Sequence, residues 1–179
     1  HLDAAHEVLT TLRPAIEAVA AGMAERLRQG GKVMACGNGG SAADAQHFAA
    51  ELVNRFQRER KPYAGLALTT DSSVLTSIGN DYDFSQVYSK QVEALGRKGD
   101  VLLAISTSGN AANVCRAAEA AQAAGLWTVA LTGGTGGQLA ARADEKLCVA
   151  STRVTARIQE GHGMIIHALC ELLEDALAE

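Results

Sequence analysis

Two short polar segments of the chain have the composition of loops that bind a phosphate group. The first, Gly37-Asn38-Gly39-Gly40-Ser41, follows the apolar run 32–36, and the second, Ser106-Thr107-Ser108-Gly109-Asn110, follows the apolar run 101–105. Each precedes a helix-like stretch, so backbone N–H groups at a positive helix end converge there with hydroxyls. Neither segment contains lysine or arginine, and a monophosphate held by amides and hydroxyls still fits. Either loop alone is more often an ordinary capped turn, but two after neighbouring parallel strands favour a phosphate site.

The first loop also permits a dinucleotide-binding interpretation, because Gly37, Gly39 and Ala42 follow the pattern G-x-G-x-x-A. That pattern requires an acidic residue about 20 residues further on, at the end of the second strand, to contact the ribose. Here the first acidic residue after that strand, Asp71, lies more than 30 residues past Gly37. Nicotinamide binding is therefore a minor alternative.

A stripe of chemically active side chains follows the first loop. His47, Glu51 and Arg55 are each four residues from the next, so on a helix they share one face. The simplest interpretation is a solvated face with a Glu51–Arg55 ion pair. However, the stripe begins only two turns from the phosphate-type loop, within reach of a small bound substrate. A histidine and a glutamate at this spacing also supply half of a zinc site.

The last helix-like segment, 158–177, carries a second polar group. Its members near the start are Gln159, Glu160, His162 and His167. Apolar neighbours surround His167 in the sequence, which makes a packed core histidine its plain alternative. His162 is interpreted either as structural or as a residue that supports the site from behind its ligands. Gln159 and His167 are ~12 Å apart along an ideal helix. Both can meet one small ligand only by reaching toward each other or by coming from different subunits.

The segments that must position these residues alternate between short apolar runs and longer helix-like stretches, which is typical of βαβ units. The expected strands are 32–36, 65–68, 101–105, 127–131 and 146–149. The expected helices are 15–27, 41–56, 84–95, 111–124, 138–142 and 158–177. We therefore predict an α/β fold, a flavodoxin-like three-layer sandwich with a five-stranded parallel sheet flanked by helices. Ligands of such sheets bind beyond the carboxyl ends of the strands.

Length and composition agree with this architecture. The 179 residues, 47% hydrophobic and 20% charged, predict one globular domain over 1–179. A net charge of −4 gives no broad positive field, so we expect no nucleic-acid partner. No apolar run approaches the ~20 residues that span a bilayer, and no signal peptide is visible, so we expect a cytoplasmic protein without a membrane partner. The four cysteines form no C-x-x-C pair, and Cys36 and Cys148 are expected to be buried thiols.

Taken together, four blocks of the sequence resemble a known family. The blocks are GNGGSAADAQHFAAEL, SIGNDYDF, GDVLLAISTSGNAANV and RIQEGHGMIIH, in this order. They closely resemble the phosphoheptose isomerases of the sugar isomerase (SIS) domain superfamily, over nearly the whole chain. The resemblance implies conversion of sedoheptulose 7-phosphate to D-glycero-D-manno-heptose 7-phosphate through an enediol, the first step toward ADP-heptose for lipopolysaccharide. It also implies a homotetramer with active sites at subunit contacts, with the N-terminal helices in 1–30 taking part in the packing.

The resemblance also implies roles for individual residues. Glu51 matches the family's catalytic base and His167 its acid partner. The substrate-binding positions match Asn38, Gly39, Gly40, Ser41, Glu51, Arg55, Asn80, Asp81, Ser106, Thr107, Ser108 and Gln159. Where the family binds zinc, one ion per subunit, the ligands match His47, Glu51, Gln159 and His167. One position departs from the pattern: Ala111 stands where many relatives have a further phosphate-binding serine, so phosphate affinity rests more heavily on the three preceding hydroxyls.

Two other functions stay open at this point. Some relatives with the same loops are non-catalytic and bind the DNA replication initiator, and the HFAA and NRF stretches are similar to theirs. Those relatives lack the glutamate and the distal histidine, whereas Glu51 and His167 are both present here, which favours an enzyme. The second alternative is another sugar-phosphate isomerase or lyase of the superfamily, acting on an amino sugar.

Overall fold

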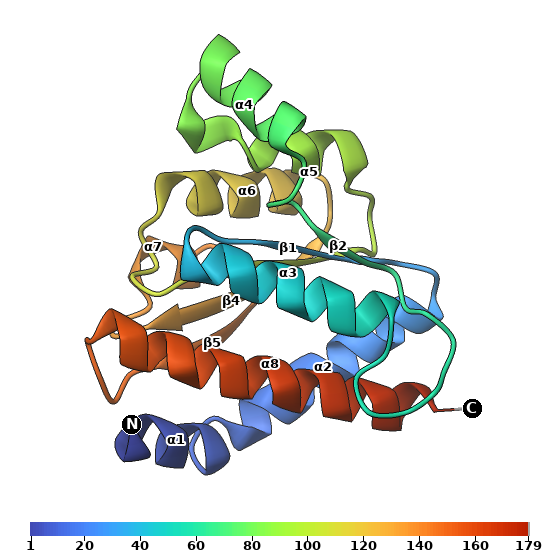
Figure 1. Ribbon diagram of the computed structural model, residues 1–179, viewed down its shortest axis with the longest axis vertical. Helices are drawn as coiled ribbons and strands as arrows, with labels where there is room; N and C mark the ends of the chain where they lie inside the picture. Colours follow the sequence, from blue (N-terminus) through green and yellow to red (C-terminus); the bar gives the residue numbers. More distant parts are fainter. Residues whose placement is uncertain (179) are drawn as a thin grey trace.

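The middle layer of the protein is a parallel sheet, seen in a computed structural model that describes residues 1–178 (Figure 1). The strand order is β2-β1-β3-β4-β5, and every pairing is parallel. The strands are β1 (Val33–Cys36), β2 (Gly65–Ala67), β3 (Val101–Ser106), β4 (Trp127–Gly133) and β5 (Glu145–Val149). The predicted α/β fold with a five-stranded parallel sheet is therefore confirmed.

Helices cover both faces of the sheet (Figure 1). On one face lie α1 (Leu2–Leu9), α2 (Arg13–Arg28), α3 (Gly40–Val53) and α8 (Thr155–Leu177). On the other face lie α4 (Ser72–Asp81), the 3₁₀ helix η1 (Phe84–Gln86), α5 (Ser89–Leu95), α6 (Ala112–Ala123) and α7 (Gly137–Ala140). None of the helices in residues 1–178 combines the length and the apolar character needed to span a lipid bilayer.

Strand alternation divides the core into two halves. In β3, Leu103 and Ile105 pack with the α2, α3 and α8 side chains, whereas Leu102 and Ala104 pack with those of α5 and α6. All residues of β3 are buried, as expected for a parallel strand covered on both faces. Because β1 and β3 are hydrogen-bonded neighbours, the two polar loops that follow them leave the sheet at the same edge.

The helix predicted over 84–95 is wrong as a single element, since the structure has η1 and α5 in its place. Between them, Val87 and Tyr88 are buried, and the Tyr88 hydroxyl donates to the Gly37 carbonyl oxygen at 2.5 Å. The break thus lets one aromatic side chain reach the end of β1. Helix α4 was not predicted, and α1 was expected only as one of the N-terminal helices within 1–30, without bounds. Val74, Leu75 and Ile78 of α4 share one helix face, but they are only half-buried, and no residue of the helix is fully buried.

The two cysteines expected to be buried behave differently. Cys36 is buried in the central strand β1, and burial raises the pKa of its thiol to about 12. Cys148 is only half-buried, because β5 is an edge strand covered by one neighbour. All four cysteines are free thiols within the described chain.

His162 of α8 is a buried titratable group that makes folding sensitive to acid. Its side chain is fully enclosed, and Nε2 donates to the Thr132 carbonyl oxygen at 2.9 Å. Burial lowers the pKa of His162 to about 4 from an ordinary value of 6.5. Between these two pH values the unfolded chain binds a proton that the folded chain does not. The free energy of unfolding should therefore fall as the pH drops from 6.5 to 4, by roughly 3 kcal/mol in total.

Urea unfolding at pH 7.5, 5.5 and 4.5 tests this prediction, with His162→Gln as the comparison. The glutamine keeps a donor for Thr132 but does not titrate, while all other groups contribute equally to both proteins. The wild-type chain should lose more stability with acid than the variant does. Equal losses in the two proteins would contradict the assignment.

Candidate active site

The loop after β1 is held rigidly at the start of α3. Gly39, its helix-capping residue, has a φ of +56°, in the left-handed region that glycine adopts readily. The side-chain amides of Asn38 and Asn113 exchange two hydrogen bonds, each of 2.8 Å. This pair ties the first loop to the first turn of α6, and it occupies the Asn38 side chain that the resemblance assigns to substrate. Ser41, in the first turn of α3, is buried.

The loop after β3 is equally constrained. Gly109 has a φ of +65°, and a Cβ atom there would lie 1.9 Å from the Gly136 carbonyl oxygen, so only glycine fits. Ser106 is buried at the end of β3, Thr107 is half-buried and Ser108 is exposed. The residue that caps α6 is Ala111, which offers no side-chain hydrogen bond to the helix. The serine that many relatives carry would thus stand at a helix N-terminus, where an anion is favoured.

A small cavity of about 210 Å³ opens beside the second loop. Its lining includes Thr107, Ser108 and Thr135, together with Arg153 from the segment before α8. Arg153 is exposed, and no hydrogen bond or ion pair to its side chain occurs within residues 1–178. Neither loop contains a cation, and Arg153 was not predicted as a site residue, because only the fold brings residue 153 next to Ser108. A larger cavity, about 650 Å³, lies at the opposite edge of the sheet and contains none of the predicted site residues.

His47 and Glu51 lie on α3, which packs beside α8 (Figure 1), whereas Arg55 lies past the end of α3 at Val53, because the helix is shorter than the predicted 41–56. His47 Nε2 lies 3.1 Å from Glu51 Oε1 and 3.4 Å from His167 Nε2. The two imidazole rings are perpendicular, with centroids 4.9 Å apart. The fold therefore joins the predicted base and its predicted partner through His47, although 116 residues, the difference between 167 and 51, separate them in the chain.

Two plain alternatives from the sequence are wrong. His167 is not a core histidine, because its side chain is exposed and its ring packs against Phe56 at a centroid distance of 5.3 Å. The expected Glu51–Arg55 ion pair is replaced by two others: Glu51 pairs with His47, and Arg55 Nε lies 3.4 Å from Glu59 Oε1. Glu51 is left with a side chain that is 23% exposed, open to a ligand from one side.

Three predicted substrate residues lie apart from this cluster. Gln159 packs at the start of α3, since a Cβ atom on Gly40 would lie 2.0 Å from Gln159 Nε2. Because Gln159 and His167 both lie on α8, eight residues apart, about two helical turns separate them, as the spacing indicated. Asn80 and Asp81, which the resemblance assigns to substrate binding, end helix α4, are exposed and hydrogen-bond to each other at 2.9 Å. Within residues 1–178, no hydrogen bond or ion pair joins these two side chains to Glu51 or His167.

Asp44 is a polar residue of the same helix that the sequence analysis missed. It lies three residues before His47, one turn along the stripe. Its Oδ2 atom is buried without a hydrogen-bond partner, and burial raises the pKa of this carboxyl to about 6. Its i, i+3 spacing from His47 was the available signal. Burial of the carboxyl depends on packing, which spacing does not reveal.

The donor chemistry of the cluster suits a zinc ion. Imidazole nitrogens and a carboxylate oxygen are ordinary zinc ligands, and two ligands of a tetrahedral ion at ~2.0–2.1 Å stand about 3.3 Å from each other. The distances of 3.1 and 3.4 Å around His47 Nε2 are close to that value. In the described part of the chain, however, no group of three such side chains already surrounds a metal position. The residue types therefore fit zinc, but in this structure the three side chains contact one another instead of surrounding a metal position.

The fold, with a glycine-rich loop after β1 and a hydroxyl-rich loop after β3, defines a SIS domain, and the chain matches the SIS domain family over residues 2–133. Among curated proteins, it is 58% identical over 168 residues to the phosphoheptose isomerase of Aromatoleum aromaticum, covering 92% of this chain and 84% of that protein. It is 55% identical to the enzyme of the same name from Thiobacillus denitrificans, covering 98% and 88%.

Solved structures agree with this similarity. Phosphoheptose isomerase GmhA from Neisseria gonorrhoeae superposes with a TM-score of 0.89 at 50% identity, covering 97% of this chain and 92% of that one. A phosphoheptose isomerase from Francisella tularensis gives a TM-score of 0.93 at 44% identity, with the same coverage. The chain belongs to the phosphoheptose isomerase family of SIS-domain enzymes, which confirms the resemblance and the prediction of an enzyme.

Proposed function

We propose that this protein converts sedoheptulose 7-phosphate to D-glycero-D-manno-heptose 7-phosphate, the first step of ADP-heptose synthesis. The observation that carries the proposal is the cluster of Glu51, His47 and His167 between α3 and α8. Glu51 and His47 lie on α3, the helix that begins at the first phosphate-type loop. Family membership supports the substrate class, because the relatives are named for a phosphorylated heptose.

Glu51 and His167 divide the proton transfers in this proposal. The Glu51 carboxylate takes a proton from C1 of the ketose, which forms a cis-enediol between C1 and C2, and returns the proton to C2. His167 carries protons between the oxygens, so that O2 gains one and O1 loses one as the aldehyde forms. Positioned acids and bases of this kind each contribute about 10²–10⁴-fold to the rate.

The phosphate end of the substrate is anchored at the second loop. Thr107 and Ser108 supply hydroxyls to the cavity, and Arg153 supplies the positive charge that the loop itself lacks. We assign Arg153 to the phosphate because its guanidinium has no protein partner in residues 1–178 and its fork matches phosphate geometry. Anchoring at this end supplies orientation to the reacting carbons.

Arg153→Gln should therefore raise KM for the sugar phosphate by about 10- to 100-fold with little change in kcat, since a hydrogen bond to a charged group contributes ~1.5–3 kcal/mol. Steady-state kinetics with the phosphorylated ketose measures this. Arg157→Gln is the matched control, because Arg157 is a nearby arginine of α8 that already pairs with Glu160. An unchanged KM in Arg153→Gln would contradict the assignment.

We further propose one zinc ion per subunit, held by His47, Glu51 and His167, with Gln159 as the predicted fourth ligand. A bound zinc ion would polarise the substrate carbonyl. Because a metal-bound carboxylate is a weaker base, Glu51 cannot be ligand and free base in one geometry. Gln159 reaches this position only by a side-chain movement or from a second subunit.

We also propose that the single domain over 1–179 works as a cytoplasmic homotetramer. Exposed Leu2 and Leu9 of α1, at 85% and 65%, support a role of the N-terminal helices in packing between subunits. Asn80 and Asp81 at the end of α4 are then available to a neighbouring site. Free thiols at Cys36 and Cys170 suit a reducing compartment.

Incubation with sedoheptulose 7-phosphate, followed by NMR, tests the proposed reaction. Signals of the aldose heptose 7-phosphate should appear at a rate proportional to the protein concentration. Binding without turnover would instead favour the non-catalytic alternative. Turnover of an amino-sugar phosphate alone would favour another isomerase of the superfamily.

A further inference from the structure

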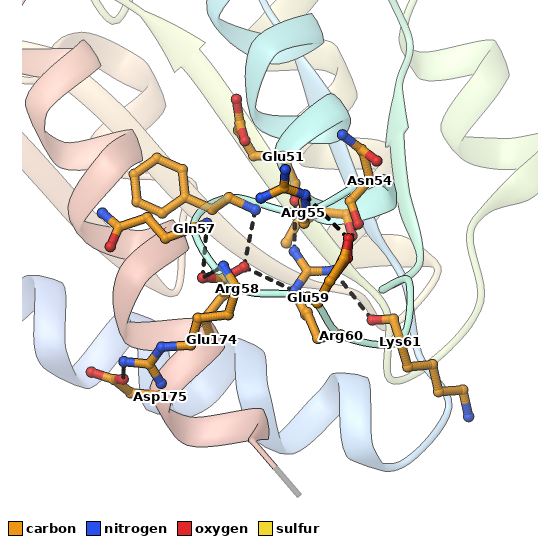
Figure 2. A network of polar contacts seen from close by, with 12 residues as sticks. Glu51, Asn54, Arg55, Gln57, Arg58, Glu59, Arg60, Lys61, Glu174 and Asp175 are labelled. Atoms are coloured by element: carbon orange, nitrogen blue, oxygen red, sulfur yellow. Dashed lines mark hydrogen bonds and ion pairs between the residues drawn. The ribbon is translucent and has the colours of Figure 1, made fainter.

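The segment 54–64, which connects α3 to β2, folds over the C-terminal part of α8 and is fixed there by one carboxylate (Figure 2). Glu174 of α8 accepts hydrogen bonds from the backbone N–H groups of Phe56 at 2.9 Å, Gln57 at 3.0 Å and Arg58 at 3.1 Å. Its side chain is only 3% exposed. Burial works to raise the pKa of Glu174, but these donors and Arg60 outweigh it and lower the pKa, so the group is a carboxylate.

Arg60 connects the same carboxylate to the end of α3. Its Nε lies 3.2 Å from Glu174 Oε1, while Nη2 donates to the Glu51 carbonyl oxygen at 2.6 Å and Nη1 to that of Leu52 at 2.9 Å. The last carbonyls of a helix have no intrahelical partners, so this guanidinium fixes the turn from which the Glu51 side chain projects. The Arg60 side chain is 10% exposed, and Figure 2 shows it between Glu174 and the α3 terminus.

Glu174 also contacts Phe56, the residue whose ring packs against His167. Phe56, whose N–H it binds, places its ring against the His167 ring at 5.3 Å with an interplanar angle of 40°. The two members of this buried ion pair therefore contact both sides of the site. Arg60 binds the backbone carbonyl of Glu51, and Glu174 binds the backbone N–H of Phe56, which packs on His167.

We propose that Glu174 and Arg60 are positioning residues that set the relative placement of Glu51 and His167. Neither side chain contacts the reacting atoms, and the inference rests on the function proposed above. A buried ion pair is by itself a weak source of stability, which argues for a positional role here. Misplacement of a reacting group by about 1 Å costs roughly 10² in rate, so loss of the pair should act on kcat.

The test compares Glu174→Gln and Arg60→Lys with the control Arg58→Met. The glutamine presents a neutral amide to the backbone N–H groups of residues 56–58 in place of the carboxylate. The lysine keeps the positive charge but lacks the guanidinium group that binds the Glu51 and Leu52 carbonyl oxygens together. Arg58 is on the same segment, but its side chain forms an exposed pair with Asp175 at 2.6 Å, and its backbone bond to Glu174 survives the substitution. We expect kcat to fall about 10²-fold in the first two variants, with KM within twofold, and the control to match the wild type.

A second readout does not depend on turnover. The His167 ring proton signals, assigned with His167→Gln, should shift in Glu174→Gln because the Phe56 ring moves, and should stay in place in Arg58→Met. Unchanged kcat and unchanged His167 signals in both Glu174→Gln and Arg60→Lys would overturn the inference. If the wild-type protein does not turn over sedoheptulose 7-phosphate, the proposed function fails, and the His167 signals still decide the positional role. Arg60→Lys decides alone if Glu174→Gln does not fold.

Discussion

Glu51→Gln should abolish isomerisation, lowering kcat by about 10²–10⁴-fold, while sugar-phosphate binding stays nearly intact. The amide has the size of the carboxylate but cannot take a proton from C1. Binding should survive because, in the proposed binding mode, the phosphate contacts Ser108 and Arg153, which line the cavity at the second loop and belong to other elements. The contact with His47 Nε2 can be kept by the amide, so the fold should also be unaffected.

The measurement combines steady-state kinetics with calorimetric binding of sedoheptulose 7-phosphate. Glu59→Gln is the control, because Glu59 is an exposed carboxylate nearby that pairs with Arg55 rather than with the histidines. Near-native turnover in Glu51→Gln would remove Glu51 as the base. Loss of both turnover and binding would instead make Glu51 a binding residue.

His167→Ala should lose activity to a similar extent without losing stability. His167 is exposed, and its ring contacts are with Phe56 and His47 at the surface of α3 and α8. Removal of a surface side chain usually changes stability by about 0.5 kcal/mol or less, whereas the loss of an acid–base group lowers the rate by about 10²–10⁴-fold.

Thermal unfolding and kinetics on the same preparation separate the two effects. His6→Ala, at an exposed position of α1, controls for loss of a surface imidazole. The prediction is a Tm close to that of the wild type with little remaining activity. A large fall in Tm with activity retained in the folded fraction would contradict the catalytic role.

The sheet was predictable from sequence because each strand is a short apolar run with polar or glycine residues at its ends. Parallel pairing followed from the helix-like stretches between the runs. Helix α4 was missed although Leu75 and Ile78 keep helical spacing, because its ten residues are rich in serine, threonine, glycine and asparagine, which favour caps and turns. The break at Val87 and Tyr88 was missed because it is set by a contact with Gly37, far away in the sequence.

The candidate site was predictable in part. Spacing placed His47 and Glu51 on one helix face, and they do contact each other. The approach of His167 depends on how α8 packs on α3, and only the family resemblance indicated it. Arg153 and Asp44 were missed for the same reason, since a cavity wall and a buried carboxyl oxygen are products of tertiary packing.

A crystal structure of the Glu51→Gln protein with sedoheptulose 7-phosphate bound would show directly whether Glu51 and His167 face the reacting carbons. We expect C1 and C2 of the sugar about 3–3.5 Å from the amide at position 51, with His167 beside the reacting oxygens. The phosphate should lie in the cavity between Ser108 and Arg153. A sugar bound with its carbonyl end away from both side chains, in every subunit of the crystal, would contradict the proposed roles of Glu51 and His167.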